Sequence, residues 1–529
     1  MRIQVRFLAR VAVVLSLSLF VTIVCVHFSE KWGSLTTVFF YDDVVYFTSA
    51  TDLIQSAKSA GLSGFLDFAQ RDRFHSPYSI LLAALSFSIL GPNDAAPYYG
   101  NYLLVVAFLS FIAYLLRRLP LSPFILCLIL FASLPFVTMC VTECRPDLAW
   151  ATFLGFSVTY LITEENLLDS FACCVSYAAL LSITLLIKPS AFAMTILVSS
   201  LACCARGILE FLQPHSISKL VPRLMRGLLI VAGTLIILVG PYAYAYGKDV
   251  WQYFYDSVFG PEAQIWVYKG PNPWLYYISG NVAESNLGKP GIIIIIMTFS
   301  LIVAEFMQRA RNIKAHLLTL ALIILIAYTI NSMAALKSPV FGGAFYGTLI
   351  FSAAFAFGSS RPLFNRLSKV GQVMVNGVLL SITVLALLLY RWPVYCDKRP
   401  YQAVCKFMRQ AQESVIQSFH GGVPPKRILF TQYSPLIPFN LEIWYLQQGL
   451  RPIFQCSGNF LQPEEFKTQI EACDVVITQE TGIMSLTSFL PDEKSQDDFV
   501  KIMKADSRFE ITCTVKDPNG KVLYVFRRR

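Results

Sequence analysis

The feature that most constrains this chain is a series of apolar runs, each about as long as a membrane is thick. A helix needs about 20 mostly apolar residues to cross the hydrocarbon core of a bilayer. Soluble domains carry about 25% charged residues, whereas this chain is 14% charged and 55% hydrophobic. We therefore predict a polytopic α-helical membrane protein of about 11–13 spans. The expected spans are 7–27, 96–116, 121–140, 148–163, 170–187, 190–206, 226–246, 290–308, 315–335, 339–357 and 372–390.

The distribution of basic residues predicts the orientation of these spans. Short loops rich in Lys and Arg face the cytoplasm, and a cytoplasmic N-terminus places most such loops inside, among them 117–120, 309–314 and 358–371. This assignment treats the apolar run 77–91 as a short juxtamembrane helix, with a full span as the alternative. The net charge of +10 is then explained by orientation, and no nucleic-acid partner is expected.

Three large pieces are predicted outside the membrane on the external face. Two belong to a transmembrane domain of residues 1–390: the first loop, about 28–95, and a loop rich in aromatic residues, about 247–289. The third is a tail domain, 391–529, in which predicted helices alternate with strands and which ends in a hairpin turned at Asn519-Gly520. This alternation is typical of a small α/β domain. An external tail would also allow a disulfide between Cys396 and Cys405.

Charged residues at the external membrane boundary are the candidates for a functional site. Signatures for phosphate loops, dinucleotide-binding loops, serine hydrolases and zinc proteases are missing from the sequence. Ionisable groups are costly in or beside lipid and mark sites by default. The candidates are Asp42 and Asp43, then Arg71, Arg73, His75 and Tyr78, then Glu143, Arg145 and Asp147, and finally Lys188.

Each candidate group also has a purely structural interpretation. Asp42 or Asp43 can cap the helix that follows, and the cations near Arg71 can anchor the chain at the interface. Arg145 can pair with Glu143 or Asp147 across a tight turn, and Lys188 can extend its charge to water.

The order of these segments resembles the C-type glycosyltransferases that use polyprenyl-phosphate sugars. The protein O-mannosyltransferases and lipid A aminoarabinose transferases show the same succession: an acidic pair in the first external loop, a His/Lys-Pro-Pro-Tyr-type helix start, a Phe-x-Leu-Phe-Gly-type ending, and two charged turns. Matching segments here are Asp42-Asp43, His75-Ser76-Pro77-Tyr78, Ser86–Gly91, Arg145-Pro146-Asp147 and Lys188-Pro189. This sequence departs from the pattern at Asp43, at Ser76 and in the spacing that leads to Asp147.

The resemblance implies the C-type glycosyltransferase architecture and an inverting sugar transfer on the extracytoplasmic face. It assigns catalytic positions to Asp42, Asp43 and Asp147, with Asp42 as the general base. It also implies that seven further residues bind the substrate and the donor phosphate: Arg71, Arg73, His75, Tyr78, Glu143, Arg145 and Lys188. The donor would be a sugar on a polyprenyl or dolichyl phosphate, and the acceptor a lipid, a glycan or a protein. No cofactor is required, although Asp42 and Asp43 could bind a divalent metal.

The resemblance also implies an integral membrane protein, located in a bacterial inner membrane, a plasma membrane or the endoplasmic reticulum. The alternative function is a transporter or flippase of a lipid-linked or small polar substrate. Transporters usually carry charges near the middle of the membrane and show repeats, whereas here the charges gather at one face.

Overall fold

The structure is a computed structural model in which the chain forms two compact units. The membrane unit comprises Met1–Val26, Ala69–Leu82 and Tyr98–Tyr395, and the tail unit comprises His27–Phe68, Ala83–Pro97 and Cys396–Arg529. The structure describes residues 2–38, 42–66, 76–212, 217–260, 267–308, 311–334, 337–360, 368–420, 424–431, 438–448, 450, 453–456, 463–484 and 496–529.

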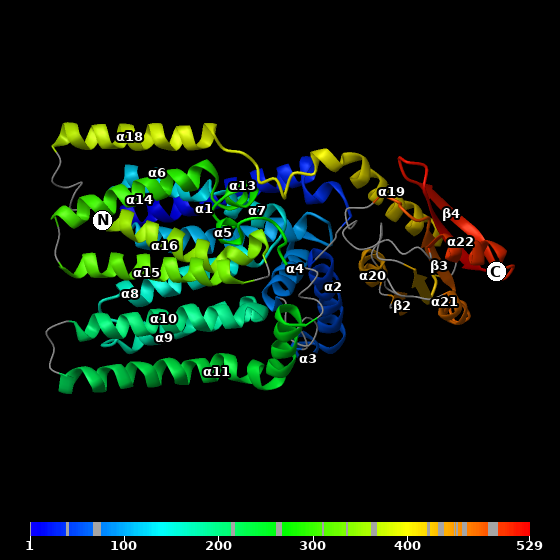
Figure 1. Ribbon diagram of the computed structural model, residues 1–529, viewed down its shortest axis with the longest axis horizontal. Helices are drawn as coiled ribbons and strands as arrows, with labels where there is room; N and C mark the ends of the chain where they lie inside the picture. The colour runs from blue at the N-terminus through cyan, green and yellow to red at the C-terminus, as the bar shows by residue number, and fades with distance from the viewer. Residues whose placement is uncertain are drawn as a thin grey trace. The chain divides into compact units, whose positions relative to one another are not determined.

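All of the predicted spans form helices, most of which run side by side in the membrane unit (Figure 1). Seven helices of the described chain are long and apolar enough to cross a membrane, or nine if each of two bent pairs counts as one span. The bounds are α1 Arg2–Trp32, α5 Ala96–Leu115, α6 Leu121–Ala132, α7 Pro135–Thr142, α8 Asp147–Thr163, α9 Phe171–Ile187, α10 Phe192–Phe211, α11 Ile217–Val258, α13 Gly280–Asn286, α14 Gly288–Gln308, α15 Arg311–Met333, α16 Gly343–Ser359 and α18 Lys369–Leu388.

Two elements differ from the expected spans for local reasons. The span expected at 121–140 bends by 53° between α6 and α7, where Pro135 starts the second helix, because proline cannot continue the first helix. Helix α11 runs on to Val258, so the first part of the predicted aromatic loop 247–289 is helical. The run 77–91 forms the short helix that the sequence predicts: α4, Pro77–Leu90, has 14 residues, which are fewer than a span needs.

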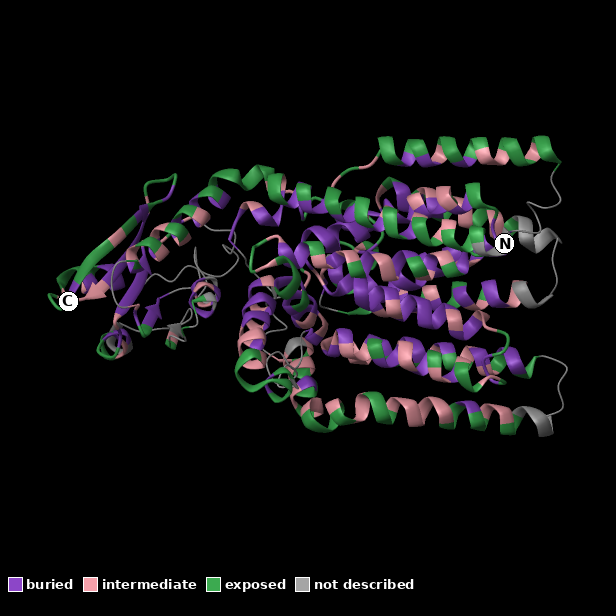
Figure 2. Ribbon diagram, turned by 180° about the vertical axis from the view of Figure 1, so that it is seen from behind, coloured by how far each residue is buried: buried purple, intermediate pink, exposed green. Residues whose placement is uncertain are grey.

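Helices α8 and α16 pack closely against each other in the membrane unit. A Cβ atom added at Gly155 would lie 2.4 Å from the carbonyl group of Gly347, and one added at Gly347 would lie 2.3 Å from the carbonyl oxygen of Ala151. Small residues of this kind let two membrane helices approach closely. Buried residues accordingly fill the centre of the bundle, whereas the outer helices α11 and α18 are largely exposed (Figure 2).

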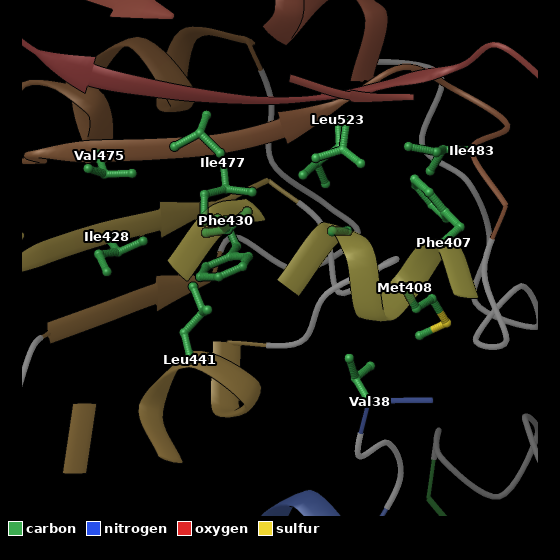
Figure 3. Close-up of a cluster of buried hydrophobic side chains, with 14 of the residues drawn as sticks. Val38, Phe407, Met408, Ile428, Phe430, Leu441, Val475, Ile477, Ile483 and Leu523 are labelled. Carbon is green, nitrogen blue, oxygen red and sulfur yellow. The ribbon is translucent and has the colours of Figure 1, made fainter. Parts of the chain in front are cut away.

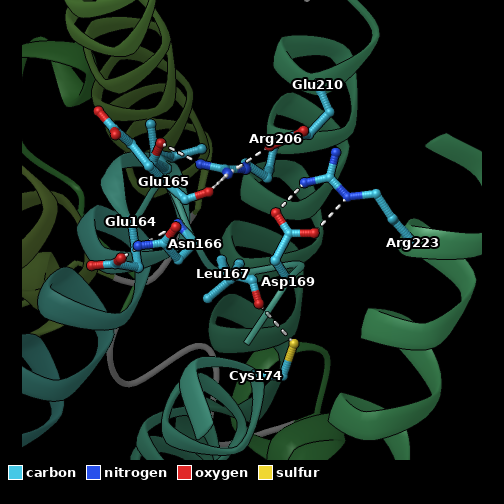
Figure 4. Close-up of polar contacts among 10 residues, drawn as sticks. Glu164, Glu165, Asn166, Leu167, Asp169, Cys174, Arg206, Glu210 and Arg223 are labelled. Carbon is cyan, nitrogen blue, oxygen red and sulfur yellow. Dashed lines mark hydrogen bonds and ion pairs between the residues drawn. The ribbon is translucent and has the colours of Figure 1, made fainter. Parts of the chain in front are cut away.

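Polar contacts fasten the loop between α8 and α9 at one end of the bundle. Arg206 of α10 donates to the carbonyl oxygens of Ile162 and Glu165 and forms a buried ion pair with Glu210 (Figure 4). Arg206 thus satisfies carbonyls at the end of α8 that have no partner within the helix. In the same loop, Asp169 accepts hydrogen bonds from Arg223 of α11.

The tail unit holds the α/β domain that the sequence predicts. Its five-stranded sheet has the order β2-β1-β3-β5-β4, with β2, β1 and β3 parallel and β5 and β4 antiparallel to their neighbours. The strands are β1 Arg427–Phe430, β2 Ile453–Cys456, β3 Val475–Gln479, β4 Phe509–Lys516 and β5 Val522–Arg528. The helices are α2 Asp42–Ala60, α3 Leu62–Leu66, α19 Gln402–Phe419, α20 Pro438–Gln447, α21 Pro463–Ile470 and α22 Gln496–Ala505. The predicted hairpin is confirmed, with Gly520 at φ +83° in its turn.

Two apolar clusters cover the two faces of this sheet. Ile428 and Phe430 of β1 join one cluster with α19 and α20, and Leu429 joins the other with α21 and α22, as the alternation of side chains along a strand requires. The proposed disulfide is wrong, because Cys396 and Cys405 are both buried free thiols. Burial raises the pKa of the Cys405 thiol, and the neighbouring side chain of Thr36 partly offsets this rise.

Candidate functional site

The turn between α7 and α8 carries three of the predicted site residues. The turn is tight: the amide of Arg145 donates to the carbonyl of Cys140 over 2.9 Å, and Cys144 adopts a left-handed conformation at φ +52°. Such a backbone costs a non-glycine residue about 1–3 kcal/mol and is often found at functional sites. Arg145 Nε pairs with Glu143 Oε2 at 2.7 Å, which is one of the two structural pairings that the sequence suggested.

Asp147 has a different partner from those expected. It is the first residue of α8 and, at 3% exposure of its side chain, is almost completely buried. Its Oδ1 accepts a hydrogen bond of 2.6 Å from Nζ of Lys188, which lies on the turn between α9 and α10. The two predicted charged turns therefore meet in one buried ion pair.

Aromatic rings surround the ammonium group of Lys188. Its Nζ lies 5.9 Å from the ring centre of Trp150 and 5.6 Å from that of Phe341, within the range of a cation–π attraction. Trp150 is held in place by a hydrogen bond of 2.9 Å from its Nε1 to Thr195 Oγ1. Lys188 does not simply snorkel, because its side chain is only 15% exposed.

The start of α4 reaches both charged turns. Ser76, which is buried, donates to the carbonyl oxygen of Ile187 over 2.9 Å, next to Lys188. Tyr78 is half-buried, and its pKa is raised by burial and by the Cys144 thiol nearby. Tyr78, Asp147 and Lys188 are thus brought into one neighbourhood of the membrane unit, together with the Glu143–Arg145 pair.

Lys337 is a second buried cation that the sequence analysis did not select. Its Nζ donates to the carbonyls of Asn331 and Ser332, over 3.3 and 2.8 Å, and faces the rings of Tyr276 and Tyr277 at 5.9 and 5.6 Å. Burial lowers its pKa. Among the described residues it forms no ion pair. Its position in a predicted external connection, 336–338, was the signal that could have identified it.

The remaining predicted residues are described only in part. Helix α2 begins at Asp42, so the acidic pair lies at a helix N-terminus, where the helix dipole favours negative charge. Asp43 is half-buried. The side chain of Asp42, and Arg71, Arg73 and His75 entirely, lie outside the described residues. Within the described chain, no three His, Cys, Asp or Glu residues gather as metal ligands would.

Comparison with known proteins identifies the fold. No family profile and no curated protein sequence matches this chain. Among solved structures, ArnT from Cupriavidus metallidurans bound to undecaprenyl phosphate superimposes with a TM-score of 0.60 at 13% identity, covering 96% of this chain and 97% of ArnT. The apo state of ArnT gives a TM-score of 0.59 at 13% identity, covering 99% and 98%.

A second neighbour is the mycobacterial arabinofuranosyltransferase AftD. It has a TM-score of 0.54 at 13% identity, and the match covers 98% of this chain and 40% of AftD. The chain therefore has the fold of the C-type glycosyltransferases and is an integral membrane protein. This confirms the resemblance at the level of fold.

Proposed function

We propose that this protein is a membrane glycosyltransferase that moves a sugar from a polyprenyl-phosphate donor to a hydroxyl group of a lipid, glycan or protein acceptor. The observation that carries the proposal is a fold shared over almost the full length of both chains with ArnT, whose structure holds undecaprenyl phosphate. Lys188, which is largely buried, and Lys337, which is buried, each lie beside aromatic rings and give this chain cationic groups of the kind that an anionic lipid headgroup needs.

The proposed reaction needs one base and several cations. Asp42 takes the proton of the acceptor hydroxyl, whose oxygen attacks the anomeric carbon of the sugar. The bond from that carbon to the phosphate oxygen breaks, and polyprenyl phosphate leaves as an anion, so no general acid is required. Donors and cations that stabilise the departing phosphate supply the electrostatic part of the catalysis. We assign that part to Lys188, Lys337 and Arg145, with Asp147 holding Lys188 in place.

Attack from the face opposite the leaving group inverts the anomeric configuration. We propose that the reaction requires no metal ion, because buried lysines can balance the phosphate charge. If a divalent ion does take part, Asp42 and Asp43 would hold it, and it would add positive charge at the phosphate.

The test is sugar transfer by purified protein from a radiolabelled polyprenyl-phosphate donor. Loss of a general base typically costs about 10²–10⁴-fold in rate, so Asp42→Asn should reduce kcat by that factor. Asp52→Asn, on the same helix and with the same loss of charge, is the matched control and should retain transfer. An Asp42→Asn variant as active as this control would remove Asp42 from the base role.

The transporter hypothesis predicts a different result. No donor would then yield a glycosylated product, and reconstituted protein would instead move a lipid-linked substrate between the two leaflets of a vesicle.

We also propose that the site and the tail face the extracytoplasmic side. A cysteine introduced at Lys501, whose side chain is 76% exposed, should react with a membrane-impermeant maleimide in intact cells. Labelling only after the cells are opened would place the tail in the cytoplasm.

A further inference from the structure

We propose that the tail domain positions the acidic pair Asp42–Asp43 by holding the chain on both sides of it. The inference deepens the proposed function, on which it rests, because it makes residues 396–529 part of the machinery that places the base. All of its contacts lie within the tail unit, which combines the first external loop with the tail domain.

The chain before the acidic pair is fastened first at the end of α1. The carbonyl oxygen of Trp32 accepts a hydrogen bond of 2.7 Å from the amide of Lys398. Gly33 follows in close contact: an added Cβ atom would lie 3.4 Å from the carbonyl oxygen of Cys396 and 2.8 Å from Cα of Ser29. A side chain at this position would clash with the backbone of Ser29 in α1, whereas the carbonyl oxygen of Cys396 lies at an ordinary contact distance.

A second set of contacts fixes the segment to α19. The guanidinium of Arg409 donates to the carbonyl oxygen of Leu35, and the hydroxyl of Thr37 lies 3.8 Å from the sulfur of Met408. Arg409 also pairs with Asp94 at 3.6 Å. Helix α19 therefore holds residues 35–37 through both backbone and side-chain contacts.

Val38 anchors the segment inside the tail domain itself. It is 4% exposed and belongs to the same apolar cluster as Met408, Phe430 and Leu441 (Figure 3). This cluster is the core between the sheet and helices α19 and α20. Val38 is thus a core residue of the tail domain that the first external loop supplies, and it precedes Asp42 by four residues.

The chain after the acidic pair returns to the same domain. Helix α2 packs against α20, and the side-chain amide of Gln55 donates to the carbonyl of Leu446 near the end of α20. The middle of α2 is buried at Phe47, Ala50 and Leu53. Helix α2 is therefore held against the tail domain by its packing on α20 and by Gln55.

These contacts make Val38, Arg409 and Gln55 positioning residues for the base. Misplacing a catalytic group by about 1 Å can cost about 100-fold in rate. Loosening the tail contacts should therefore lower kcat without changing the affinity for the donor. A tail that served only as an independent domain would not show this dependence.

The experiment compares two identical truncations in the two cores of one domain. Val38→Ala removes two methyl groups from the core that contains the first loop, and Val500→Ala removes the same groups from the core on the other face of the sheet. Val500 is 5% exposed, so the two sites match in burial as well. Both variants are made in the full chain and measured for transfer and for hydrogen exchange of the amides of residues 42–50.

We expect Val38→Ala to accelerate exchange in residues 42–50 and to reduce kcat about tenfold or more at unchanged donor KM. Val500→Ala should alter neither quantity. Equal exchange and equal kcat in the two variants would overturn the proposal. Asp42→Asn, measured in the same assay, separates the two claims: if it remains as active as the wild type, Asp42 is not the base, and if it is inactive while the two truncations behave alike, only the positioning role fails.

A milder pair of variants covers the case in which Val38→Ala does not fold. Gln55→Ala removes the hydrogen bond to α20, and Lys58→Ala changes an exposed residue of the same helix as the control. We expect slower transfer and faster exchange of residues 42–50 for Gln55→Ala alone. The same behaviour in both variants would contradict the role of α20.

Discussion

The ion pair of Lys188 with Asp147 allows the most quantitative prediction. Replacing Lys188 with Met would leave a carboxylate with 3% exposure without the ammonium group that now lies at 2.6 Å. Two unit charges at that distance attract by about 6 kcal/mol at an effective dielectric constant of 20. Desolvation offsets part of this attraction, and breaking a buried pair typically costs about 3–5 kcal/mol. We expect Lys188→Met to lower the free energy of unfolding by about that amount.

A double-mutant cycle of Lys188→Met and Asp147→Asn separates the interaction energy of the ion pair from the effect of replacing each residue alone. Asp147→Asn alone leaves the ammonium group of Lys188 without its carboxylate, whereas the double variant leaves no buried charge at either position. The double variant should therefore be less destabilised than the sum of the single variants, by about 2 kcal/mol or more. Unfolding is measured by denaturant titration in mixed detergent micelles.

Lys188→Arg is the control because it keeps the positive charge. It should retain most of the stability and most of the donor affinity, whereas Lys188→Met should lose both. Additive losses in the cycle, or a Lys188→Met variant within about 0.5 kcal/mol of the wild type, would refute the reasoning.

Four further predictions concern other parts of the molecule and its dependence on metal ions. Gly155→Ala should destabilise the protein by about 1–3 kcal/mol or more, because the added Cβ would lie 2.4 Å from the backbone of Gly347. Gly233→Ala is the control, since a Cβ there would lie in open space and should not destabilise the protein. Thermal unfolding of the two variants measures the difference. Lys337→Met should raise the donor KM about tenfold, as expected for a loss of about 1.4 kcal/mol of binding. Because burial lowers the pKa of Lys337, the folded protein releases this proton before the unfolded chain does, so stability should rise as the pH increases toward 10.5 and Lys337→Met should flatten that rise. Chelation with EDTA should leave transfer by the wild type unchanged, and restoration of lost transfer by added Mn²⁺ or Mg²⁺ would show that a metal is needed.

Much of the fold could be predicted because the physical causes are local in sequence. Apolar runs of bilayer length become helices, and their order survives even where Pro135 bends one of them. In the tail, the succession of predicted helices and strands and the turn at Asn519-Gly520 predict the α/β domain and its final hairpin. These features depend on neighbouring residues and not on distant partners.

The pairings within the site could not be predicted in the same way. Asp147 and Lys188 are 41 residues apart, whereas Arg145, two residues from both Glu143 and Asp147, offered either carboxylate a partner close in sequence. Lys337 appeared as a single lysine in a short connection, and only the folded chain surrounds it with Tyr276 and Tyr277. Such contacts follow from helix packing, which apolar periodicity does not specify.

The grouping of the first loop with the tail is the least predictable feature. Val38 is an ordinary apolar residue in the sequence, and nothing near it indicates that it completes a core made by residues beyond 400. The disulfide that the sequence suggested is wrong for a related reason, since the thiol of Cys405 lies beside Thr36 of this same loop. A long-range partner replaced the one that sequence proximity suggested.

The most direct test of the central claim is the stereochemistry of transfer by the purified protein. With a polyprenyl-phosphate sugar of defined anomeric configuration and a hydroxyl acceptor, the wild type should form a product of inverted configuration, measured by NMR, and Asp42→Asn should form it about 10²–10⁴-fold more slowly. A product of retained configuration, or no product from any polyprenyl-phosphate sugar, would contradict the account.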